Sequence, residues 1–146
     1  MNYLKLIPLF FLLFFFAELH GQASHKTAQI VIVPVGTNKI KINVPSSQLE
    51  IVKTKGTRIS IEIAVRLNSG SLPLLEYLAK QGRYQMKVQE DELTRILTLS
   101  PTTNKNLLII KGKECEETII YRMHIPEYVK EIETLNSKEW NFAPHQ

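Results

Sequence analysis

The most regular pattern in this chain is a strict alternation of apolar and polar residues. In residues 57–67, four β-branched side chains recur at every second position, and charged or small residues lie between them. The apolar set is Ile59, Ile61, Ile63 and Val65. A spacing of two places these side chains on one face of a strand, whereas a helix needs spacings of three and four. This run therefore predicts a half-buried β-strand.

The same alternation returns in residues 39–44, 83–89, 93–99 and 118–125. Residues 83–89 and 93–99 flank the acidic loop 90–92, which is typical of a β-hairpin, and Leu93, Leu97 and Leu99 are expected on one side. Two short apolar runs, 29–33 and 107–110, predict strands buried on both faces. Residues 49–53 follow a turn and predict a further strand, and residues 128–135 fit either a last strand or a short helix. Eight or nine strands are expected in all.

One segment, residues 72–81, carries the pattern of a helix. Ser69 or Ser71 precedes it as a capping residue, and Gly82 follows where a left-handed residue usually ends a helix. Its apolar stripe consists of Leu74, Leu75 and Leu78. A helix this short must pack on a sheet to be stable. The predicted fold is mostly β, an antiparallel β-sandwich or small β-roll with one short helix.

The N-terminus has the pattern of an export signal. Lys5 precedes twelve apolar residues, 6–17, which are too few to span a bilayer as a helix. Small residues at Gly21 and Ala23 predict cleavage after Ala23; the alternative is an uncleaved anchor. We expect a signal peptide at 1–23, a single β-rich domain at 24–136 and a loose tail at 137–146. The mature chain is expected without a transmembrane segment, in the periplasm, on the outer cell surface or outside the cell.

Composition narrows the class of protein. The chain has 146 residues, 44% of them hydrophobic, and a formal net charge of +4, which is ordinary for one globular domain. Its one cysteine excludes an internal disulfide.

Several of these segments together resemble the N-terminal part of secreted bacterial adhesin-like proteins. The resemblance rests on the strands at 39–51 and 55–67, the Leu-rich helix and the aromatic strand after it, and the ending Tyr121-Arg-Met-His-Ile-Pro126. In that family a β-solenoid of short Gly-rich repeats follows, but no repeated period occurs in this chain. The resemblance implies a cap or recognition domain, and it leaves open whether the chain is a shortened relative of a longer solenoid protein.

The candidate chemical groups are sparse. Cys115 is flanked by Glu114 and Glu116, and negative neighbours disfavour a reactive thiolate. The histidines His25, His124 and His145 lack the spacing of a zinc site. The sequence therefore predicts no catalytic residue, no metal, no cofactor and no enzymatic activity.

Basic residues gather in the first half of the chain. They are Lys39, Lys41, Lys53, Lys55 and Arg58. If their strands are neighbours, they form a basic face that would bind an anionic glycan, lipopolysaccharide or nucleic acid; the alternative is a solvated face whose lysines prevent edge pairing. The expected partner is an envelope protein or an anionic glycan. Few aromatic residues lie among them, so no nucleic acid is expected.

Taken together, these expectations predict a secreted, non-enzymatic envelope protein with an adhesin-like β domain and a structural or binding role. The alternatives are an inhibitor or immunity-like partner of another secreted protein, or a small secreted hydrolase.

Overall fold

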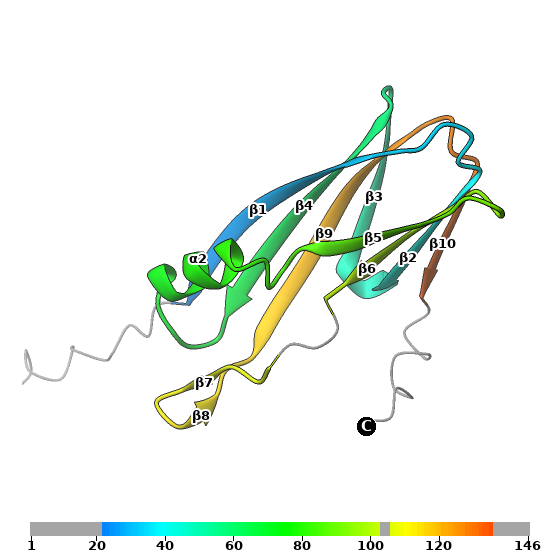
Figure 1. The fold of residues 1–146 in the computed structure, drawn as a ribbon. Coiled ribbons are helices and arrows are strands. Elements are labelled where there is room, and N and C mark those ends of the chain that lie inside the picture. The colour runs from blue at the N-terminus through cyan, green and yellow to red at the C-terminus, as the bar shows by residue number, and fades with distance from the viewer. Residues whose placement is uncertain (1–21, 103–105, 136–146) are drawn as a thin grey trace, which may run out of the picture.

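A computed structural model gives the arrangement of these segments (Figure 1). It describes residues 22–102 and 106–135. The described chain is mostly β, with one short α-helix, two four-stranded sheets and a small two-stranded hairpin. Residues 1–21 of the predicted signal segment and the predicted tail 137–146 lie outside the described residues, whereas Ala23, after which cleavage is predicted, is the first residue of β1.

Ten strands, one α-helix and one 3-10 turn make up the described part. They are β1 (Ala23–Ile32), β2 (Lys39–Pro45), η2 (Ser46–Gln48), β3 (Leu49–Thr54), β4 (Arg58–Leu67), α2 (Leu72–Lys80), β5 (Met86–Asp91), β6 (Ile96–Pro101), β7 (Ile109–Ile110), β8 (Lys113–Glu114), β9 (Glu117–Pro126) and β10 (Glu131–Leu135).

Each four-stranded sheet is mixed rather than antiparallel. The first has the order β1-β4-β9-β3, in which β3 runs parallel to β9 and the other pairs are antiparallel. The second has the order β10-β2-β6-β5, in which only β5 and β6 are antiparallel. The prediction of antiparallel sheets was therefore wrong. The chain changes sheet after β1, β2, β4, β6, β8 and β9, so strands that follow one another in sequence often do not pair.

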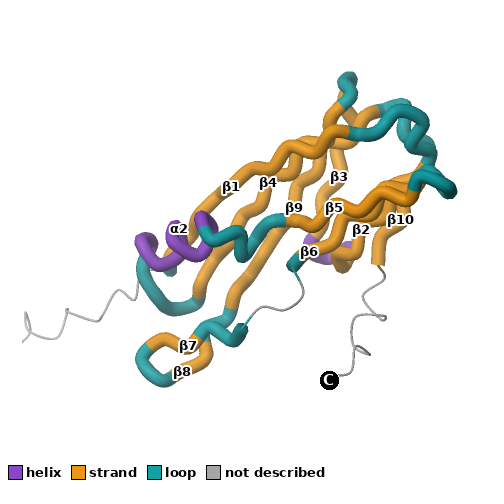
Figure 2. The backbone as a smooth tube through the Cα atoms, viewed as in Figure 1, coloured by secondary structure: helices purple, strands orange, loops and turns teal. Residues whose placement is uncertain are grey.

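The period-two prediction is confirmed for the central strands. Every second residue of β2, β4 and the second half of β9 is buried, and both sheets contribute to one hydrophobic cluster. Its fully buried members include Ile40, Ile42, Val44, Ile59, Ile61, Ile63, Leu97, Leu99, Met123 and Ile125. The two sheets appear as two layers in Figure 2.

The helix forms where the sequence predicts it. The Ser71 side chain caps α2 by accepting a hydrogen bond from the Leu74 amide at 3.4 Å, and Gly82 has a φ of 78° just beyond its end. Leu75 is fully buried, and α2 lies against β1 (Figure 2).

The run 29–33 is not buried on both faces. It belongs to β1, an edge strand, and Ile30 and Ile32 on its outer side are 58% and 74% exposed. On the inner side of β1, the Gln29 side chain binds the backbone of Met86 in β5. Its Nε2 donates to the Met86 carbonyl and its Oε1 accepts from the Met86 backbone amide, both at 2.9 Å. This side chain thus replaces a strand neighbour and joins the edges of the two sheets.

Three other local predictions were corrected. The strand expected at 83–89 begins at Met86, because Arg83 and Tyr84 lie in the turn that follows α2. The hairpin itself is confirmed, but Leu93 lies in its turn and is 96% exposed. The run 107–110 contains only the two-residue strand β7, with Ile109 exposed. The segment 128–135, which left two alternatives, ends in the strand β10.

Candidate functional site

The five predicted basic residues are divided between the two sheets. Lys39 and Lys41 lie on β2 in the second sheet, whereas Lys53, Lys55 and Arg58 belong to β3, β4 and the turn between them in the first. The condition that their strands be neighbours is therefore not met for all five. The binding role predicted for them remains a prediction.

Lys39 is neutralised by the neighbouring strand β10. Its Nζ lies 2.5 Å from a carboxylate oxygen of Glu133 and 4.0 Å from one of Glu131. The hydrogen bond to Glu133 raises the pKa of Lys39, and the same bond lowers the pKa of Glu133. The positive charge at this position is thus balanced within the sheet.

Lys53 points toward the inner face of the first sheet. It lies opposite the buried Ile125 in the parallel β3–β9 pair, and its Nζ donates to the Val129 carbonyl at 2.8 Å. An inward-pointing lysine on an edge strand prevents another strand from pairing there, which is the alternative role the sequence left open. This residue is therefore not on the surface that Lys55 and Arg58 share.

Lys55 and Arg58 are brought together in a shallow depression of about 500 Å³, which we call the cationic depression. It is lined by Thr54, Lys55, Gly56, Thr57, Arg58, Ser60, Glu62 and His124. The topology creates it: β3 and β4 are consecutive but lie on either side of β9, so residues 55–57 pass beyond the end of β9. This turn is the tip where β3 and β4 meet in Figure 1.

His124 enters the cationic depression from β9. It lies opposite Ser60 and faces the outer side of the sheet, next to Glu62. Its Nε2 is 3.3 Å from a carboxylate oxygen of Glu62. The depression therefore combines two cations, one histidine–carboxylate pair and three hydroxyl groups.

Among the described residues, Lys55 and Arg58 form no ion pair. Two other cations of the sheets do: Arg122 Nε lies 2.9 Å from Glu50 on the same outer face, and Lys39 pairs with Glu133. The position of Gly56 is also open, since a Cβ atom there would meet no heavy atom within 4 Å. Lys55 and Arg58 are thus exposed cations without a carboxylate counter-charge in the described chain.

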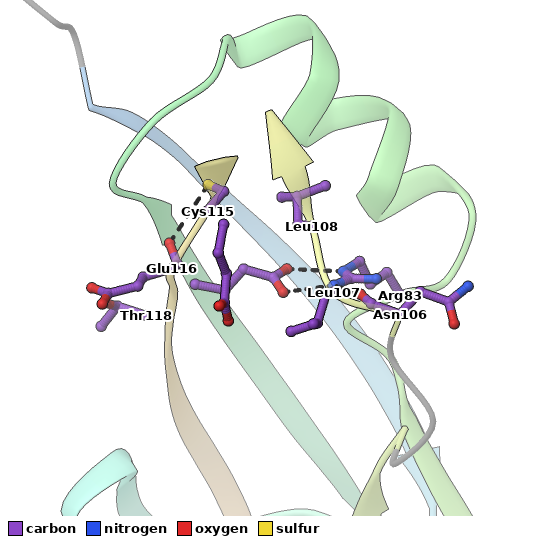
Figure 3. A pocket seen from close by; sticks show the side chains of 9 residues that line it. Arg83, Asn106, Leu107, Leu108, Cys115, Glu116 and Thr118 are labelled. Atoms are coloured by element: carbon purple, nitrogen blue, oxygen red, sulfur yellow. Dashed lines mark hydrogen bonds and ion pairs between the residues drawn. The ribbon is translucent and has the colours of Figure 1, made fainter. Parts of the chain in front are cut away.

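A second group of polar side chains lies at the opposite end of the first sheet (Figure 3). Arg83 Nε and Nη2 donate to the two carboxylate oxygens of Glu117 at 2.9 and 2.6 Å, and the Tyr84 hydroxyl donates to the same carboxylate at 2.7 Å. Arg83 Nη2 also donates to the Asn106 carbonyl at 2.8 Å. We call Arg83, Tyr84 and Glu117 the carboxylate cluster.

The side chains of the carboxylate cluster are largely buried and bonded to one another. The side chains of Arg83 and Glu117 are only 14% and 15% exposed. Burial, followed by the hydrogen bond to Glu117, raises the pKa of Tyr84. A carboxylate that accepts three hydrogen bonds from its own chain is suited to fixing the turn after α2 onto β9, and less to acid–base exchange with a ligand.

Cys115 borders the same pocket, whose volume is about 410 Å³. Its thiol is buried and donates to the Ser69 carbonyl at 3.0 Å. This contact ties the link between β8 and β9 to the loop before α2, and it gives the buried thiol a structural role.

Sequence reasoning missed the carboxylate cluster and the Gln29 bridge. Arg83 and Glu117 are 34 positions apart, and Gln29 and Met86 are 57 apart, so no local spacing signals either contact. Only the sheet pairing brings these residues together.

The described ranges were also inspected for metal ligands and for membrane spans. In residues 22–102 and 106–135, no three His, Cys, Asp or Glu side chains are grouped so that they could hold a metal ion. The one α-helix in these ranges is too short to cross a membrane.

Comparisons with protein-family models, with curated proteins and with solved structures found no match. The resemblance to adhesin-like proteins therefore remains an expectation from the residues quoted above.

Proposed function

We propose that this protein is an exported, non-enzymatic binding domain of the bacterial cell envelope, which holds an anionic glycan through the cationic depression. The observation that carries this proposal is the contact pattern of Lys55 and Arg58. Both are exposed, both lack a carboxylate partner among the described residues, and hydroxyl groups surround them. Such a surface suits the carboxylate or sulfate groups of an acidic polysaccharide, because it offers charge together with hydrogen-bond donors.

The export part of the proposal rests on the sequence. Lys5, the apolar run 6–17 and the small residues before position 24 have the pattern of a secretory signal. An envelope location would place the domain among acidic polysaccharides. The inner faces of the two sheets share one apolar cluster, which supports a sandwich as the scaffold for the binding surface.

A glycan of repeating units suits the shape of the depression. The site is shallow and open rather than enclosed, so it would contact one or two charged units of a long chain. Weak contacts of this kind are strengthened when several units can bind in turn. We expect binding to weaken steeply as salt is added, because exposed charges are screened.

The test compares two double variants that remove the same charge from different sheets. Lys55→Gln/Arg58→Gln removes both positive charges from the cationic depression, whereas Lys39→Gln/Lys41→Gln removes two lysines from β2. The probe is polygalacturonate, with neutral dextran as the ligand control, and binding is measured by calorimetry at low and high salt.

We expect the Lys55/Arg58 variant to lose about tenfold in affinity, which corresponds to about 1.4 kcal/mol. The Lys39/Lys41 variant should keep its affinity for polygalacturonate within about twofold of that of the unchanged protein, since these two substitutions change only the net charge. Equal weakening of both variants would show that net charge alone attracts the polymer and would refute the proposed site.

A further inference from the structure

A separate cavity lies between the start of α2 and the β7–β8 hairpin. Its volume is about 660 Å³, and it is lined by Ser69, Gly70, Ser71, Leu74, Ile110, Lys111 and Lys113. It occupies the end of the first sheet opposite the cationic depression, since β4 begins at the depression and ends just before Ser69 (Figure 1). The two sites are therefore about 30 Å apart along a ten-residue strand.

The walls of this cavity are apolar and come from two distant segments. Leu74 projects from the first turn of α2, and Ile110 comes from β7. Ile110 packs directly on Gly70: a Cβ atom at Gly70 would lie 2.7 Å from Ile110 Cδ1, and the φ of Gly70 is 111°. Glycine is thus required at this position both by the backbone and by the contact with Ile110.

The rim of the cavity is cationic. Ile110 and Lys113 are directly opposite in the hairpin, so they share one face, while Glu114 points to the other face with Ile109. Lys111 and Gly112 form the two-residue turn, with φ values of 50° and 75°. In the described part of the chain, neither Lys111 nor Lys113 forms an ion pair, and both are exposed.

We propose that this cavity binds a single-chain amphipathic anion of the fatty-acid type. The apolar chain would lie between Leu74 and Ile110, and the carboxylate would face Lys111 and Lys113. The volume falls within the range of about 300–1,000 Å³ that is usual for small-ligand pockets, which are mostly apolar with a few polar groups at defined places. The charge of the rim selects an anion over a neutral or cationic chain. This site does not depend on the proposed glycan function.

The first experiment compares three ligands with the same chain and different head groups. Decanoate and decyltrimethylammonium below their micelle concentrations, and decanol below its solubility limit, are titrated into the full mature chain, and binding is followed through backbone amide shifts. We expect decanoate to bind tightest, with shifts concentrated in residues 69–74 and 109–113. Equal binding of decanol would show that the lysines play no part, and shifts centred elsewhere would refute the cavity as the site.

The second experiment changes the rim and the walls separately. Lys111→Asn/Lys113→Gln removes both charges and keeps a residue that tolerates the left-handed turn position. Lys87→Gln/Lys130→Gln, which changes two exposed lysines that do not line the cavity, is the matched control. Leu74→Trp fills the space without touching the charges.

We expect the rim variant to bind decanoate about tenfold more weakly and the control variant to bind it within about twofold. The filled variant should lose decanoate binding while keeping the circular dichroism spectrum of the unchanged protein. A filled variant that is folded and still binds decanoate at full strength would overturn the proposal, and so would an unaffected rim variant.

Discussion

Two arginines, Arg83 and Arg58, have opposite surroundings in this molecule. Arg83 is mostly buried, and it donates to both oxygens of Glu117 and to the Asn106 carbonyl. Arg58 is exposed at the start of β4 and has no carboxylate partner among the described residues. The comparison teaches that the same side chain fixes the fold where the chain supplies its counter-charge, and remains exposed to solvent where the described chain does not.

The largest expected effect is on the carboxylate cluster. Glu117→Gln removes the charge that balances Arg83 in a site where both side chains are about 15% exposed, so it should lower the free energy of unfolding by about 3 kcal/mol. Urea denaturation at neutral pH measures this. The matched control is Glu116→Gln, whose side chain is exposed, and it should change stability by less than about 0.5 kcal/mol. If both variants lost the same free energy of unfolding, the ion pair between Arg83 and Glu117 would contribute no more to stability than an exposed charge.

Alkaline pH should separate the buried tyrosines from the exposed ones. Burial raises the pKa of Tyr121 to about 12, and burial with the Glu117 hydrogen bond raises the pKa of Tyr84. Well below pH 10 both phenols are protonated in the folded and the unfolded chain, so their full contribution to the free energy of unfolding is present. Above it the unfolded chain loses these protons first, and stability falls by up to about 1.4 kcal/mol per pH unit for each tyrosine.

The measurement is the free energy of unfolding between about pH 9 and about pH 11.5. Tyr121→Phe and Tyr84→Phe should each make the decline shallower, whereas Tyr77→Phe, at a side chain 59% exposed, should leave it unchanged. A decline that none of the three variants alters would assign the alkaline sensitivity to other groups.

Replacing each arginine by lysine tests the comparison directly. Arg83→Lys keeps the charge but loses the two-point contact with Glu117, which should cost about 1 kcal/mol of stability. Arg58→Lys has no such contact to lose and should stay within about 0.5 kcal/mol of the unchanged protein. Thermal and urea unfolding report both values, and an equal cost at the two positions would contradict the distinction.

The smallest expected effect concerns Glu62, the one carboxylate in the cationic depression. Glu62→Gln removes a negative charge beside His124 and should raise the affinity for polygalacturonate about twofold at low salt, with no gain at high salt. Glu90→Gln, at an exposed position in the second sheet, serves as the control for net charge. An increase that is equal in both variants would place the effect outside the depression.

The alternation of apolar and polar residues predicted burial correctly in strands that have a neighbour on each side and one face toward the core. The alternation in β2, β4 and β9 predicted which side chains form the core, and Ser71 and Gly82 predicted both ends of α2. It failed at the edges of sheets. Ile30 and Ile32 have a sequence typical of a buried strand, but β1 is an edge strand with an uncovered outer face.

The sequence by itself determined that the described chain is β-rich, where its one helix lies, and which residues of the central strands are buried, because the period of a strand or helix is a local property of the chain. Only the tertiary structure decided that the sheets are mixed, that Lys53 faces inward, and that Lys55, Arg58 and His124 meet at the end of β9. Strand pairing depends on contacts between segments tens of residues apart. No short window of sequence contains both partners of such a contact.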